Sequence, residues 1–251
     1  MKNSTYVWGM LGWHDLRQAY RRSALGPFWI TAGMGIQIAT MGVVFSLIFQ
    51  TQPQEYVPFL AVSIILWMFM AASINDSCLS FISAEGIIKQ LDVPLHVHVF
   101  RVLWKNTLNF AHNLVIIPIA FLIVGFSMGS SIFLFVPAFA LLILNLSWIS
   151  MILALLSARF RDTPPIVNSL MTVAFYVTPV MWYPSLLPGG TAHLLLGLNP
   201  LYHLLQIVRL PILGELPTLE NWYLSALLAI AGWAITLLSF ARFRSRVAFW
   251  V

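Results

Sequence analysis

The feature that most constrains this chain is a set of long stretches without one charged side chain. Residues 28–49, 106–158 and 163–208 contain no Asp, Glu, Lys or Arg. The hydrocarbon core of a bilayer is ~30 Å thick, and about 20 apolar residues of α-helix cross it. Each stretch reaches that length. The sequence therefore predicts an all-α polytopic membrane protein rather than a soluble domain.

Composition supports this class. Only 8% of the residues are charged and 60% are hydrophobic, whereas soluble domains average roughly 25% charged residues. The formal net charge of +5 comes from basic residues at the ends of the apolar stretches, where they act as topology signals and contact anionic lipids. We therefore expect no nucleic-acid partner. The single cysteine, Cys78, excludes an internal disulfide, and the first 22 residues lack the apolar core of a cleavable signal peptide.

The charge and turn pattern divides the chain into one transmembrane domain, 1–251. Residues 5–22 are amphipathic and predict a helix that lies in the headgroup region. Residues 79–102 are too polar to span, which predicts a cytoplasmic helix–turn–helix excursion broken at Pro94. A glycine-rich break at 125–130 separates two spans. The six predicted spans cover residues 28–49, 56–77, 104–125, 132–156, 166–182 and 222–241.

The positive charges indicate the topology. Of thirteen Lys and Arg residues, only Arg209 lies outside the N-terminus, the 79–105 segment, the 159–161 loop and the C-terminus. Six spans place those four regions on one side, which the positive-inside rule makes cytoplasmic. A seventh span within 184–214 would move the basic C-terminus outside. That segment therefore predicts a periplasmic re-entrant hairpin, shielded by protein.

Motifs for catalysis are absent from the sequence. It has no GxSxG, no HExxH and no Walker-type GxxxxGK[ST]. His96 and His98 have no obvious acidic or cysteine partner, so we expect no metal site, and no cofactor is predicted. Span interiors carry almost no charge, which disfavours an ion-coupled carrier. These observations predict a transport subunit rather than an enzyme, with ATP hydrolysed on another polypeptide.

The fifth predicted span carries a row of polar side chains. Asn168, Thr172 and Tyr176 recur every four residues, which places them on one face of a helix. Such a row would suit the wall of a channel for a sugar chain, and helix–helix packing through polar residues is the alternative. Other candidates for channel lining are Tyr183 and, in the first two spans, Gln37, Thr40 and Trp67.

In order and spacing, several segments resemble the permease subunits of ABC exporters for O-antigen and related polysaccharides. The resemblance covers nearly the whole chain. It is carried by YRRSALGPFWIT (20–31), AEGIIKQLDVPLHVHVFR (84–101), ARFRDTPPIV (158–167), VTPVMWYP (177–184), NPLYHLLQIVRLPILG (199–214) and RFRSRVAFWV (242–251).

The resemblance implies a homodimer in the bacterial inner membrane, with two copies of a separate ABC ATPase and both termini cytoplasmic. Its substrate would be a glycan linked to a polyprenyl diphosphate lipid. A coupling helix that contacts the ATPase would map to 84–94 and a second contact to 159–165, while 184–214 would form the periplasmic gate. The implied coupling residues are Glu85, Gly86, Lys89, Arg159, Arg161 and Asp162.

Arginines at the N-terminal interface could attract the lipid diphosphate. The candidates are Arg17, Arg21 and Arg22, and topology with anionic-lipid contact is the alternative role. For the whole chain the sequence keeps two alternatives to glycan export. One is an ABC permease for teichoic acid, a lipid or a drug, and the more distant one is a membrane enzyme acting on polyprenyl-linked sugars.

Overall fold

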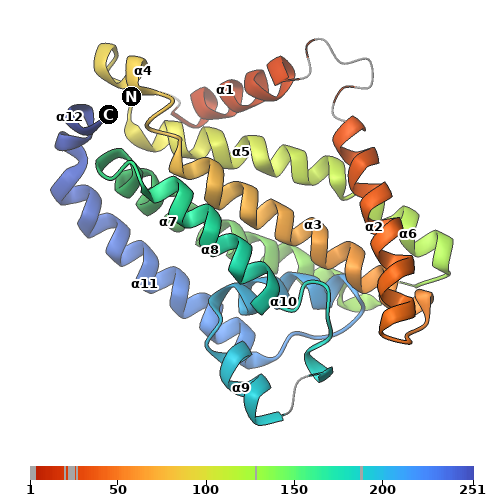
Figure 1. Ribbon diagram of the computed structural model, residues 1–251. Coiled ribbons are helices and arrows are strands. Elements are labelled where there is room, and N and C mark those ends of the chain that lie inside the picture. Colours follow the sequence, from red (N-terminus) through yellow and green to blue (C-terminus); the bar gives the residue numbers. More distant parts are fainter. Residues whose placement is uncertain (1–3, 20, 22–25, 27, 128, 187–188) are drawn as a thin grey trace.

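The computed structural model describes residues 4–19, 21, 26, 28–127, 129–186 and 189–251, and all regular structure in these ranges is helical (Figure 1). Within them, five helices are long and apolar enough to cross a membrane. They are Phe28–Ile48, Pro53–Cys78, Leu95–Val124, Ser130–Arg159 and Leu219–Trp250.

Helix α3 (Pro53–Cys78) is the centre of the bundle. Most of its residues are buried, in keeping with a sequence that is apolar on every side. Its neighbours, all of which pack directly on it, are α2 (Phe28–Ile48), α5 (Leu95–Asn113), α6 (Ile116–Val124), α7 (Phe135–Arg159), α8 (Thr163–Val177) and α10 (Pro200–Ile212).

The helix that carries the third predicted span begins earlier than its charge pattern suggested. The short helix α4 (Glu85–Gln90) is followed by a break at Pro94, and α5 then starts at Leu95. The charges of this first part of α5 are paired with other helices. Arg101 forms an ion pair with Asp15, and Lys105 Nζ lies 2.9 Å from Asp76 Oδ2. Pairing lets a polar helical stretch pack where an unpaired one would stay in water.

Helix α1 (Ser4–Ala19) lies along α5. Trp8 packs edge-on against Trp104, with ring centroids 5.8 Å apart. The two backbones meet at Gly12, where an added Cβ would stand 2.8 Å from the carbonyl oxygen of Arg101. Glycine therefore permits this close contact. Tyr6, Met10 and Trp13 remain exposed on the free side of α1.

A break at Gly125 separates α6 from α7. Helix α6 ends at Val124, and Gly125 follows with a φ of 74°, the left-handed conformation that favours glycine. The chain resumes as a 3-10 turn, η1 (Ser130–Leu134), leading into α7.

Helix α8 has 15 residues, about 22 Å of helix, and is shorter than the five long helices.

After α8 the chain forms three short elements, one long helix and two further short elements. These are η2 (Pro184–Leu186), α9 (Gly189–Gly197), α10, α11 (Leu219–Phe243), η3 (Arg244–Arg246) and α12 (Val247–Trp250). Figure 1 shows α1, α4 and α12 gathered at one end of the bundle, and α9 at the opposite end. We call these the α4 end and the α9 end.

Candidate functional site

The polar row of α8 lies on an open surface. Asn168, Thr172 and Tyr176 are all exposed, and Tyr176 is 68% exposed. The Thr172 hydroxyl donates to the Asn168 carbonyl at 3.0 Å, which satisfies the hydroxyl within the helix. The structure thus brings the three predicted lining residues of this helix onto one accessible face.

Exposure alone does not single out that face. Only Val167 and Met171 of α8 are buried, so the apolar side chains of Leu170 and Val173 are also 61% and 59% exposed. A membrane helix with so little cover has room for lipid, water or another subunit on most sides.

Helix α2 is open in the same way. Its buried residues are Met34, Ile38, Gly42 and Ser46, all on the side that faces α3. Gln37 is half-buried, with its amide 3.9 Å from the Met41 sulfur, and Thr40 is exposed. Both predicted lining residues of α2 therefore lie outside the packed core.

The remaining two lining candidates lie deeper. Trp67 is buried, and its ring packs 5.7 Å from that of Phe175, so it supports α8 from behind. Tyr183 is half-buried, with its ring 4.4 Å from that of Phe59. The structure does not bring either side chain onto the face that carries Asn168.

The predicted coupling residues gather at the α4 end. Glu85 and Lys89 form an exposed ion pair with a 2.6 Å contact, and this hydrogen bond lowers the pKa of the Glu85 carboxyl. Helix α4 has no buried residue, and nothing lies within 4 Å of a Cβ added at Gly86. Arg161, close enough to act on Glu85 electrostatically, lies with Asp162 in the exposed loop between α7 and α8.

Arg159, the last residue of α7, is also exposed, and its guanidinium carbon lies 5.3 Å from the centroid of the Trp250 ring. The sixth coupling candidate is therefore held next to α12.

The basic side of α1 is hollowed. A pocket of about 340 Å³ is lined by His14, Arg17, Gln18 and Arg21. Two of the three arginines predicted to contact a lipid diphosphate thus share one cationic surface, and the third, Arg22, lies outside the described residues.

Sequence reasoning set Arg209 apart but gave it no role, and the structure makes it the centre of a buried network. Its side chain is 1% exposed. One guanidinium nitrogen donates to Ser63 Oγ at 2.9 Å and to the Pro179 carbonyl at 2.6 Å. Two others donate to Gln206 Oε1, and the group lies 4.6 Å from the Phe59 ring centroid. In the described part of the chain it has no acidic ion-pair partner.

A second buried polar group, His203, lies six residues before Arg209 on α10. Its Nδ1 lies 2.7 Å from Asn221 Oδ1, at the start of α11, and its Nε2 lies 2.9 Å from the Gly197 carbonyl, at the end of α9. Asn199 joins α10 to the chain after α8 by donating to Thr178 at 2.9 Å. These polar groups fix the short helices of the α9 end to the long ones. The signal available in the sequence was the position of Arg209, away from every other basic residue.

Known proteins resemble this chain over most of its length. The O-antigen export system permease protein RfbA of Myxococcus xanthus is 25% identical over 197 residues, covering 76% of this chain and 74% of that protein. Two proteins of the same name from Klebsiella pneumoniae are 27% identical over 231 residues (91% of this chain, 87% of that protein) and 26% identical over 175 residues (69% and 68%).

The family model described as ABC-2 type transporter matches residues 6–213. This match spans α1 to α10, so it includes the open face of α8, the α4 end and the Arg209 network. The chain is a multi-pass membrane protein that belongs to the ABC-2 type transporter family.

Proposed function

We propose that this chain is the channel-forming permease subunit of an exporter that moves a lipid-linked, O-antigen-like polysaccharide across the inner membrane. The observation that best supports a channel is the exposed polar row Asn168–Thr172–Tyr176 on a helix of a membrane protein. Sugar hydroxyls require hydrogen-bond partners, and sugar C–H faces pack on aromatic rings. The relatives' names support the substrate class.

The proposed conduit is built by two copies of the chain. One bundle contains too few helices to enclose a wide path, and both α2 and α8 leave most of their surface uncovered. A homodimer that brings α2 and α8 of each copy toward the other would cover the apolar part of these surfaces. Gln37, Thr40 and the α8 row would then border the path.

The proposed topology has six crossings, of which α8, the fifth along the chain, is the shortest. An even number of crossings returns the chain to the side where it began, and the position of α1 and α12 at the same end supports this (Figure 1). The α4 end, which carries most of the basic residues, is then cytoplasmic. Helices α9 and α10 form the periplasmic re-entrant gate, and α1 lies in the cytoplasmic headgroup layer with Tyr6, Met10 and Trp13 toward lipid.

Membership of the ABC-2 family implies an ABC ATPase partner. We place its contact at the α4 end, on the surface formed by Glu85, Gly86, Lys89, Arg159, Arg161 and Asp162, with one ATPase on each permease copy. Because the sequence has no Walker motif, the purified chain alone is expected to hydrolyse no ATP above background. ATPase activity of the isolated chain that survives repeated purification would contradict this assignment.

The lipid end of the substrate is expected at α1. Arginine binds phosphate oxygens through paired N–H donors, and the pocket beside Arg17 and Arg21 provides two such groups.

A glycan-export assay tests the proposal as a whole. In cells that lack this chain but retain its ATPase, the lipid-linked polymer should accumulate in the inner leaflet, and surface glycan should be lost. The wild-type chain should restore surface glycan, and Thr172→Leu with Tyr176→Leu should restore much less at equal membrane level. Leu170→Met is the matched control on the apolar side of α8. Restoration by the double variant equal to wild type would exclude the polar row as the conduit wall.

A further inference from the structure

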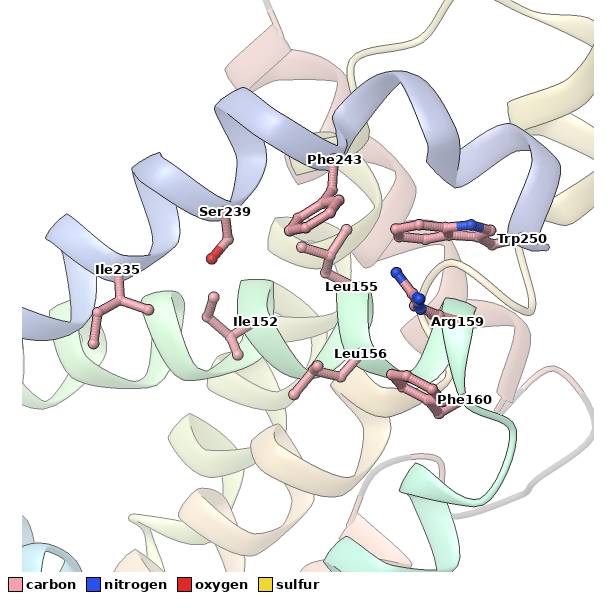
Figure 2. Close-up of a pocket in the computed structure, with 9 residues that line it drawn as sticks. All are labelled: Ile152, Leu155, Leu156, Arg159, Phe160, Ile235, Ser239, Phe243 and Trp250. Atoms are coloured by element: carbon pink, nitrogen blue, oxygen red, sulfur yellow. The ribbon is translucent and has the colours of Figure 1, made fainter.

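An amphipathic groove lies on the outside of the bundle, between α7, α11 and α12 near the α4 end (Figure 2). Its volume is about 420 Å³. Figure 2 shows its two halves: Ile152, Leu156 and Ile235 lie toward one end, and Arg159 lies toward the other with Trp250 beside it.

The cation at the groove's polar end is held in position without being neutralised. The guanidinium carbon of Arg159 lies 5.2 Å from the Phe160 ring centroid and 5.3 Å from the Trp250 ring centroid, and Figure 2 shows it between the two rings. Among the residues that the structure describes, no Asp or Glu forms an ion pair with Arg159. Its N–H donors are therefore available to an anion.

The other end of the groove is apolar and open. Leu156 and Ile235 are 42% and 55% exposed, while Leu155 forms a buried floor. Ile152 and Arg159 are seven residues apart on α7, so about 10 Å of apolar wall leads away from the cation. A ligand that fits has an anionic head and a hydrocarbon chain.

We propose that this groove binds an anionic phospholipid of the bilayer. Its phosphodiester is placed on the Arg159 guanidinium, and part of one acyl chain follows Ile152, Leu156 and Ile235. Charge complementarity supports an anionic headgroup, because Arg242 and Arg244 lie at the same end of the bundle, where α11 passes into η3. Guanidinium is well matched to phosphate oxygens. The proposed phospholipid site does not depend on whether the transported substrate is a glycan.

This site gives the lipid a position beside the loop that begins at Phe160. Phe160 follows the last residue of α7 and leads into Arg161 and Asp162. Because Arg159 belongs to the proposed ATPase contact, a headgroup on its guanidinium would lie at the edge of that contact.

The test is native mass spectrometry of the full chain, released from micelles containing phosphatidylglycerol or phosphatidylcholine at equal concentration. Wild type should retain phosphatidylglycerol in preference to phosphatidylcholine. Arg159→Gln should weaken phosphatidylglycerol retention about tenfold, the low end for loss of a charge-assisted hydrogen bond. Arg246→Gln is the matched control, since it removes an exposed arginine outside the groove lining, and retention should be unchanged.

A second variant tests the apolar half. Ile235→Trp should fill the groove and lower phosphatidylglycerol retention with every arginine in place, whereas Leu238→Trp, on the exposed side of α11 away from the groove lining, should not. Equal retention by wild type, Arg159→Gln and Ile235→Trp would overturn the proposal. So would displacement of the lipid by inorganic phosphate, or efficient cross-linking between copies through Ser239→Cys in a Cys78→Ala chain, which would identify the groove as a contact between subunits.

Discussion

At the scale of single residues, Arg209 shows how this chain tolerates a buried cation. An unpaired charge without hydrogen bonds is expensive to bury, and no carboxylate pairs with this one in the described part of the chain. Four hydrogen bonds to three acceptors and the Phe59 ring replace its water. The acceptors come from α10, α3 and the segment after α8, so one side chain joins three parts of the fold.

Arg209→Met should therefore destabilise the protein although it removes a buried charge. It leaves Gln206 Oε1 and the Pro179 carbonyl without their donor, whereas Ser63 keeps its bond to the Phe59 carbonyl. Each buried unsatisfied group costs about 1–3 kcal/mol. We expect a lower thermal midpoint in detergent and faster loss of the monodisperse fraction. The exposed Arg246→Met should match wild type. A midpoint for Arg209→Met equal to that of wild type would show that the network is not stabilising.

At the scale of elements, the close contact between α1 and α5 depends on the absence of a side chain at Gly12. A Cβ at Gly12 would lie 2.8 Å from the Arg101 carbonyl oxygen and 2.9 Å from the Trp104 ring, whereas nothing lies within 4 Å of a Cβ at Gly9. Both glycines belong to the same helix, so they offer a matched comparison.

Gly12→Val is expected to push α1 away from α5 and to break the pairing of Asp15 with Arg101. Limited proteolysis should then cut the α1 segment faster than in wild type. Gly9→Ala should leave the contact intact and gain up to about 1 kcal/mol of helix propensity. If both variants resist proteolysis equally, α1 does not rely on close packing at Gly12.

Helix α4 gives a second comparison at this scale. Gly86 has open space around its Cβ position, as does Gly190 of α9 at the other end of the bundle. Gly86→Leu should leave the thermal midpoint of the permease unchanged and weaken its co-purification with the ATPase, because the new side chain would stand on the proposed docking surface. Gly190→Leu should affect neither. Equal ATPase recovery with both variants would move the docking surface away from α4.

At the scale of the whole molecule, charge-free stretches sufficed to place the long helices, because a bilayer demands both length and apolarity. The same rule misjudged the start of the third one. His96 and Arg101 fell in the predicted cytoplasmic excursion and Lys105 at the start of the predicted span 104–125. One helix, α5, includes all three, and Asp15 and Asp76 pair with its two cations. Such pairs join residues 86 and 29 positions apart, and local pattern cannot reveal them.

The candidate site was predictable to a similar degree. Spacing of four placed Asn168, Thr172 and Tyr176 on one face, since this follows from helix geometry alone. Burial of Trp67 behind α8 and the partners of Arg209 depend on how helices pack, which the spacing of residues within one helix does not encode. The lone position of Arg209 in the charge pattern was the one visible clue.

The central claim is that the polar row of α8 borders a water-filled path in the assembled transporter. Single cysteines at Asn168, Thr172 and Tyr176, in a Cys78→Ala chain assembled with its ATPase, should react with a membrane-impermeant thiol reagent during turnover. Cysteines at Leu170 and Val173 are the controls, because these positions are as exposed as the row in the single chain. We predict labelling of the row and protection of the controls. Equal labelling of all five positions would contradict a conduit on this face.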